Sequence, residues 1–166
     1  MKLVDCGQFN GVTNRQYVVD YIQRAVDLLD VDALGVKSLK FVRLSCRARW
    51  YERTRSVLMD LSTRSFQPDY RGYKYKTFGG KADLTPAGVF LHECGHALSF
   101  RHHSIIKKFR ALRKRKRKSI TGYGTGNVYE DIAECFRLYV SNGALLQELA
   151  PERYEIMDKY ARQYLK

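Results

Sequence analysis

Two histidines with a glutamate between them form the most chemically distinctive stretch of the sequence, His92-Glu93-Cys94-Gly95-His96. Side chains four positions apart on an α-helix lie on one face, one turn apart, so His92 and His96 can share a single zinc ion. Glu93 lies beside that face, where its carboxylate can take a proton from a zinc-activated water molecule. A buried helix whose histidines only hydrogen-bond in the core would leave the acid unexplained. The stretch therefore indicates metal-assisted hydrolysis.

A third metal ligand has two candidates, since a catalytic zinc ion usually has three protein ligands and one open position. His102 follows His96 by six residues, which is the spacing of the long metzincin signature, but Ser99 stands where that signature has a helix-breaking glycine. Glu130 and Glu134 lie four residues apart, and on a helix both would share one face. One of these carboxylates could bind the metal while the other accepts a hydrogen bond from the far nitrogen of a ligand histidine.

The joint spacing of three segments resembles the catalytic domain of the anthrax lethal factor family, which includes the bacterial Pro-Pro endopeptidases. These proteins are zinc metalloproteases of the gluzincin type. The resemblance runs from about Gly88 to the C-terminus, close to half the chain, and the matching segments are His92 to Ala97, Tyr123-Gly124 and Glu130 to Leu138.

The resemblance implies a role for each matched residue. One catalytic Zn²⁺ would be bound by His92, His96 and Glu130. Glu93 would be the general base, and Tyr123 would direct its hydroxyl at the oxyanion of the tetrahedral intermediate. Glu134 would support a ligand histidine from outside the metal shell. The implied activity is that of a zinc-dependent endopeptidase with a peptide or protein substrate.

The fold implied by the resemblance is a zincin-like α+β fold. It consists of a small, mostly antiparallel or mixed sheet, an active-site helix and a helical C-terminal half. We expect a single catalytic domain over 1–166, with the sheet in about 1–81 and the helices that carry the zinc site in about 82–166. The segment 1–81 itself shows no residue-by-residue match to the family, so substrate specificity does not follow from the resemblance.

The helices that must position these residues have clear start and stop signals. Thr85 predicts an N-cap and Pro86 the first residue of the helix that carries the histidines. Asn127, followed three residues later by Glu130, resembles a capping box and predicts a helix to about Ser141. The dipeptide Asn142-Gly143 favours a stop there, and a last amphipathic helix is expected from Pro151.

The first half of the chain alternates between helical and extended patterns. Apolar spacing predicts a helix from Asn14, with that residue as a plausible cap. Strands are expected at Leu39–Leu44, at Trp50–Leu61 and at Gly72–Phe78. The last strand is the candidate sheet edge for the substrate, although its alternating lysines could equally protect an edge from unwanted pairing.

Length and composition favour a folded, reduced protein. With 166 residues and 45% hydrophobic content, the chain can bury a core without disulfides. Its cysteines lack metal-knuckle spacing, and Cys94 and Cys135 are expected to be buried thiols. The sequence contains no membrane-spanning run and no recognisable signal peptide. We therefore expect a monomer that is cytoplasmic, or exported by a route that needs no such signal.

The net charge of +13 comes mainly from one segment, residues 101–118, which holds ten Lys or Arg residues and no acid. Outside this segment the chain has 20 basic and 17 acidic residues. The segment predicts a basic patch for an acidic partner or a nucleic acid. The alternative function is accordingly a nucleic-acid-associated protease of the SprT-like type, or a basic nucleic-acid-binding protein. The predicted patch consists of Arg113, Lys114, Arg115, Lys116, Arg117 and Lys118.

Overall fold

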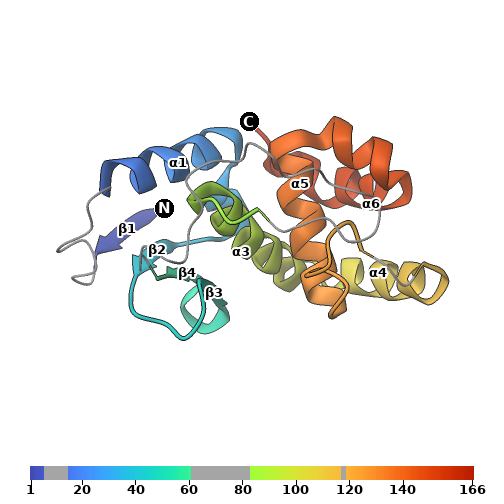
Figure 1. The fold of residues 1–166 in the computed structure, drawn as a ribbon, viewed down its shortest axis with the longest axis horizontal. Helices are drawn as coiled ribbons and strands as arrows, with labels where there is room; N and C mark the ends of the chain where they lie inside the picture. Colours follow the sequence, from blue (N-terminus) through green and yellow to red (C-terminus); the bar gives the residue numbers. More distant parts are fainter. Residues whose placement is uncertain (6–14, 61–82, 117–118) are drawn as a thin grey trace.

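The computed structural model describes residues 1–5, 15–60, 83–116 and 119–166, which form a four-stranded mixed sheet followed by a helical C-terminal half (Figure 1). The fold class is therefore α+β, as predicted. The elements in chain order are β1 (Lys2–Asp5), α1 (Arg15–Leu28), α2 (Val31–Leu34), β2 (Ser38–Phe41), β3 (Ala48–Tyr51), the 3-10 turn η1 (Glu52–Thr54), β4 (Ser56–Met59), α3 (Pro86–Arg101), α4 (His103–Arg115), α5 (Val128–Leu149), α6 (Pro151–Ala161) and the 3-10 turn η2 (Arg162–Tyr164).

The sheet has the strand order β1-β2-β4-β3. Strands β1, β2 and β4 run parallel, and β3 pairs antiparallel with β4 at one edge of the described sheet. Leu39 and Phe41 of β2 and Val57 and Met59 of β4 are fully buried, as expected for strands in the middle of a sheet. The predicted alternative of a mixed sheet is thus the one observed.

The strand expected within Trp50–Leu61 is β4, with Val57 and Met59 on its buried face, but the segment also contains the end of β3 and a turn. The reversal follows the polar run 52–55, which has no apolar alternation to continue a strand. At its end Arg55 adopts a left-handed conformation with φ of 52°, which completes the turn. The reversal makes β3 an edge strand. The predicted strand Leu39–Leu44 is β2, and it ends at Phe41.

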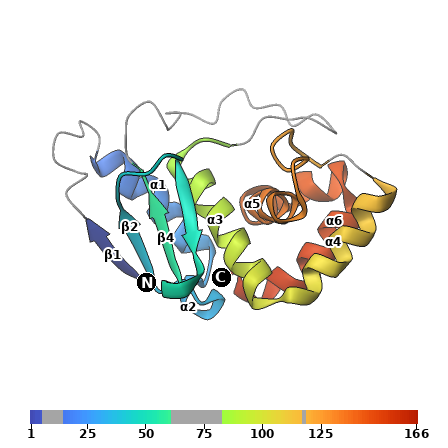
Figure 2. The same ribbon diagram turned by 90° about the horizontal axis from the view of Figure 1, so that it is seen from below.

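Helix α3 lies between the sheet and the helical half of the molecule (Figure 2). Thr85 is its N-cap, with the side-chain oxygen accepting the Gly88 N–H at 3.0 Å, and Pro86 is its first residue, as predicted. Apolar residues surround it on most sides, and Phe90, Leu91, Ala97 and Leu98 of the helix are buried. A helix that is apolar all round belongs in a core, and this location holds its few polar side chains rigidly.

Helix α5 begins as the sequence predicts but runs further. The Asn127 side chain accepts the N–H groups of Tyr129 and Glu130, so it caps the first turn. The predicted stop at Asn142-Gly143 is a kink at Asn142, whose φ of −161° is not helical. The Asn142 side chain then accepts the Leu145 N–H and starts a further helical stretch to Leu149, because asparagine is a good N-cap as well as a helix stop.

Several expectations fall on residues outside the described ranges. These are the cap at Asn14, the end of a strand at Leu61 and the strand Gly72–Phe78. Among the described cysteines, Cys94 and Cys135 are buried free thiols, as predicted, and Cys46 is an exposed one. Within the described ranges, the longest and most apolar helices fall short of what crossing a membrane requires.

Candidate metal centre

The three polar residues of the sequence motif come together on one side of α3. One ligand atom each from His92, Glu93 and His96 lies within 4.8 Å of the other two, which is close enough for the group to hold a metal ion. The two imidazole rings meet edge to face, with their centroids 4.9 Å apart. His92 and Glu93 are at most 9% exposed, so an ion bound here would be largely shielded from solvent.

Helix α5 brings two carboxylates to the same histidines. Glu130 Oε2 lies 2.9 Å from His92 Nε2 and 3.6 Å from His96 Nε2. Glu134 Oε1 lies 2.7 Å from the other nitrogen of His92, Nδ1. Glu134 thus contacts the far side of the ring, while Glu130 faces the same nitrogen atoms that a shared metal ion would use.

Gly95 explains how α5 comes so close to α3. A Cβ atom at this position would lie 2.6 Å from the Cα of Ala133, which is backbone and cannot turn aside. Ala133 lies directly before Glu134, and Gly95 directly before His96. The closest approach of the two helices is therefore placed beside the acids and the histidines.

The charges of the two histidines differ because their surroundings differ. Burial lowers the pKa of His92, but hydrogen bonds to Glu130 and Glu134 raise it more, to about 9. Burial and the positive charge of His92 lower the pKa of His96 to about 4. Without a metal, one proton on His92 supplies the positive charge between the rings and Glu130. A bound cation would replace that proton.

Glu93 contacts the sheet and does not hydrogen-bond to the histidines or to Glu130 in the described structure. Its Oε2 accepts the backbone N–H of Trp50, on the edge strand β3. Burial raises the pKa of Glu93 to about 7, although the charge of His92 and the Trp50 N–H favour the carboxylate. A carboxylate with a pKa near neutrality can both accept and return a proton at physiological pH.

Glu134 is held by a buried cation that the sequence analysis did not single out. Arg137, three residues later on α5, donates from Nη2 to Glu134 Oε2 at 2.9 Å and is itself fully buried. On the other side of Arg137 lies Asp83, whose carboxylate is 3.9 Å from Nη1. Burial raises the pKa of Glu134, but Arg137 and His92 lower it more, to about 2. Glu134 therefore stays ionised and fixes Nδ1 of His92 as a donor.

Tyr123 lies on the loop before α5, with its ring centroid 5.5 Å from that of His92. Partial burial, together with the charges of Glu130 and Glu93, raises its pKa, so the hydroxyl keeps a proton to donate. Arg113 of α4 holds the loop by donating to the carbonyl oxygens of Gly124 and Thr125 at 2.9 and 2.8 Å.

The site opens into a pocket of about 540 Å³. One wall is formed by β3 and η1, with Ala48, Arg49, Trp50 and Glu52. Across from the sheet the pocket continues past the metal-site residues to the end of α3 and the start of α4. The lining residues there are Ser99, Phe100, His103 and Ile106, and Tyr129 of α5 also lines the pocket. A volume of this size accommodates several side chains of a peptide.

His102, the other candidate for the third ligand, lies elsewhere. Helix α3 continues to Arg101 without a break, and His102 separates it from α4. Its Nε2 lies 2.7 Å from the hydroxyl of Tyr164, and its ring also lies near Tyr160. His102 is not among the residues that line the pocket.

The four described residues of the predicted basic patch 113–118 differ in their contacts. Arg113 turns inward to the loop before α5 and to Asp131, 3.3 Å away. Arg115 and Lys116 both pair with Glu152 of α6, at 3.4 and 2.7 Å. Lys114 is exposed, and Arg117 and Lys118 lie outside the described ranges.

Comparison with known proteins does not place the chain in a family: no family model matches it, and no curated protein shows significant similarity to it.

Proposed function

We propose that the protein is a zinc-dependent endopeptidase of the gluzincin type. The observation that carries the proposal is the position of Glu130, whose Oε2 faces Nε2 of both histidines while Glu134 occupies Nδ1 of His92. If the histidines of α3 served only for packing, there would be no reason for α5 to place a carboxylate at each of the two ring nitrogens of His92.

The residues fit a zinc ion by chemistry and by spacing. Two neutral imidazoles and one carboxylate are a common ligand set for catalytic zinc, with one position left open. Ligands about 2.0–2.1 Å from a tetrahedral ion lie roughly 3.3 Å from one another. The separation of 3.6 Å between Glu130 and His96 is close to this value. The separation of 2.9 Å between Glu130 and His92 is shorter because a hydrogen bond joins these atoms.

Glu93 is proposed as the general base and not as a ligand. Its carboxylate is turned to the Trp50 N–H at the edge of the sheet, on the pocket side of the motif. When bound, zinc would supply Lewis acidity that polarises the scissile carbonyl and lowers the pKa of a water molecule. Glu93 would take the proton from that water and return it to the amine that leaves.

Tyr123 is proposed to donate its hydroxyl to the oxyanion that develops on the substrate carbonyl. The ring lies at the pocket, and its raised pKa keeps the proton in place. A single donor of this kind contributes about 3–4 kcal/mol to transition-state stabilisation in other enzymes. Arg113 would maintain the position of Tyr123 through the carbonyl groups of its loop.

The substrate is proposed to bind as an extended peptide along β3. This strand is at the edge of the described sheet and borders the pocket, so its outward backbone groups, apart from the Trp50 N–H that Glu93 accepts, can pair with a further strand. We therefore propose β3 as the edge that binds the substrate, while Gly72–Phe78, the edge expected from the sequence, lies outside the described residues. A zincin-like fold is proposed on the same basis, because α3 packs against a sheet whose edge faces the motif.

A digestion experiment tests the function directly. Zinc-loaded wild type and the Glu93→Gln variant, matched for zinc content, would be incubated with a peptide library made from a digested proteome, and new termini would be identified by mass spectrometry. We expect cleavage by wild type and about 10²–10⁴-fold less by Glu93→Gln, because the variant lacks the proton acceptor. Equal cleavage by both proteins, or none by zinc-loaded wild type, would contradict the proposal.

A further inference from the structure

Helix α4 exposes several lysines and arginines on two opposite flanks. Its apolar residues Ile105, Ile106, Phe109 and Leu112 are buried and attach it to the body of the protein. On the exposed side, each residue advances by about 100° around the helix axis. Lys107, Arg110 and Lys114 therefore follow His103 along one flank, and Lys108 and Arg115 lie on the other.

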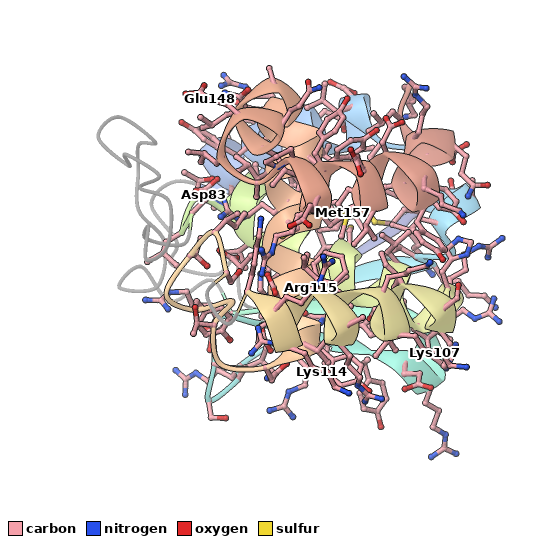
Figure 3. The ribbon with its side chains drawn as sticks, turned by 90° about the vertical axis from the view of Figure 1, so that its right-hand side faces the viewer. Asp83, Lys107, Lys114, Arg115, Glu148 and Met157 are labelled. Atoms are coloured by element: carbon pink, nitrogen blue, oxygen red, sulfur yellow. The ribbon has the colours of Figure 1, made fainter. Side chains whose placement is uncertain are left out.

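Figure 3 shows the same division of α4 into two sides. Lys107 and Lys114 lie on the lower side of the helix in this view, and Arg115 lies on the upper side, toward α6. The ion pair between Arg115 and Glu152 of α6 agrees with this placement. Among the described residues, no acidic side chain forms an ion pair with Lys107, Arg110 or Lys114. We call these three residues the basic row.

The basic row follows directly on residues of α4 that line the pocket. His103 and Ile106, in the first turn of α4, both line the pocket that contains the metal-site residues. From His103 to Lys114 the helix rises by about 16 Å, at 1.5 Å per residue. An extended peptide covers that distance with about five residues, at roughly 3.3 Å each. A substrate leaving the pocket along α4 would thus keep its side chains near the three cations.

The shape of this surface suits a peptide better than a nucleic acid. Of the six predicted patch residues, Arg113 is directed inward and Arg115 and Lys116 already face Glu152. The three cations of the basic row form a single file along α4. The described part of α4 exposes no Tyr, Trp or Phe on which a base could stack.

We propose that the basic row is a specificity subsite for acidic side chains on one side of the cleaved bond, so that the substrate is a peptide segment with several Asp or Glu residues there. This inference rests on the proposed endopeptidase function. It names the class of substrate, which neither the motif nor the metal ligands determine.

Anchored probes separate the subsite from the metal site. Each probe carries a zinc-chelating hydroxamate at one end, a tail of four Glu, four Gln or four Lys residues, and a fluorescein label at the other end. Two sets are made, with the hydroxamate at the N-terminus or at the C-terminus, so that the tail leaves the metal in either direction. Binding to the zinc-loaded full-length protein is measured by fluorescence anisotropy at low and high NaCl.

Two double variants change the net charge of the protein by the same amount, one within the basic row and one outside it. Lys107→Glu with Arg110→Glu reverses two charges of the basic row. Lys108→Glu with Lys159→Glu makes the same change in net charge on the other flank of α4 and on exposed α6. All four positions are exposed, and thermal unfolding by circular dichroism checks that both variants are folded as well as wild type.

In one tail direction, we expect the Glu tail to bind about tenfold more tightly than the Gln tail at low salt, with the difference shrinking at high salt. The basic-row variant should lose this preference, and the control variant should keep it. Equal binding of Glu and Gln tails in both directions would overturn the subsite while leaving the zinc site intact. Failure of every probe, including the Gln tail, would instead remove the zinc site on which the inference rests.

The nucleic-acid alternative is tested in the same assay with labelled 20-nucleotide single-stranded and duplex DNA and RNA. The proposal predicts weaker binding than for the Glu tail at the same salt concentration. Tighter binding that the basic-row variant abolishes would overturn the proposal and assign the surface to nucleic acid.

Discussion

Neighbouring positions in the first turns of α5 carry carboxylates with opposite surroundings. Glu130 is 21% exposed at its side chain and faces the imidazoles of His92 and His96. Asp131, the next residue, is fully buried and faces arginines. The first carboxylate opens toward a pocket, whereas the second is enclosed between α5, α4 and α6.

The partners of Asp131 satisfy it completely. Arg153 of α6 donates two hydrogen bonds to it, at 3.0 and 2.9 Å, and Ser119 donates one at 2.6 Å. Arg113 of α4 adds a longer contact at 3.3 Å. The cluster joins three helices and the loop that carries Tyr123.

The difference between the two carboxylates lies in the kind of positive charge that each one faces. An arginine keeps its proton under all physiological conditions, so the Asp131 cluster is permanently neutralised and closed to a metal ion. A histidine can lose its proton and offer a lone pair, so the Glu130 cluster can exchange a proton for a metal ion. One turn of helix thus supports both a structural ion cluster and a candidate metal centre.

The largest loss of stability is expected when the Asp131 cluster is disrupted. Asp131→Asn keeps the size of the side chain but removes the negative charge that the buried Arg153 faces. We expect the free energy of unfolding of the metal-free protein to fall by about 3–5 kcal/mol. Urea denaturation followed by circular dichroism measures it. Glu130→Gln, in the same assay, should cost about 1 kcal/mol. Equal losses in the two variants would mean that the carboxylates do not differ as described.

The next effect concerns the contact that aligns the two helices. In Gly95→Ala, the new Cβ would meet the backbone of Ala133, so α5 must move relative to α3. We expect a loss of about 1–3 kcal/mol in unfolding free energy, together with weaker zinc binding because both glutamates move with α5. Gly143→Ala on the same helix is the control, since its Cβ would meet Tyr154 at an ordinary 3.7 Å. A Gly95→Ala protein as stable as wild type would contradict the close packing.

A smaller effect, on zinc affinity, is expected at Glu134, which contacts both an arginine and a histidine. Its carboxylate lies between Arg137 and Nδ1 of His92. Glu134→Gln should leave the ligand atoms in place but weaken the hold on the His92 ring, and we expect zinc affinity to fall about 10–100-fold. Competition with a chelator of known affinity measures this. Unchanged affinity would show that Glu134 serves the fold and not the metal.

Local signals in the sequence predicted the helices around the site well. Thr85 with Pro86, and Asn127, start α3 and α5 as expected, because capping depends on residues within one turn. The turn at 52–55 interrupts the expected strand, and it ends in a left-handed conformation of Arg55 that no local signal predicts.

Contacts between residues far apart in the chain are much harder to predict from the sequence. The four-residue spacing of Glu130 and Glu134 predicted a shared face, and both meet the histidines. The contacts between Glu93 and Trp50 and between Arg153 and Asp131 join residues far apart in the chain, and no spacing rule predicts them. A run of cations does not show which member turns inward, so the sequence alone places Arg113 in a basic patch although it contacts the loop before α5.

Zinc content is the most direct test of the central claim that His92, His96 and Glu130 together hold one ion. Purified wild type, Glu130→Ala and the matched control Glu148→Ala, exposed on the same helix, would be dialysed against a weak chelator and measured by inductively coupled plasma mass spectrometry. We expect about one zinc per chain in wild type and in Glu148→Ala, and far less in Glu130→Ala. Zinc fully retained in Glu130→Ala would contradict it, because the third ligand would then lie elsewhere.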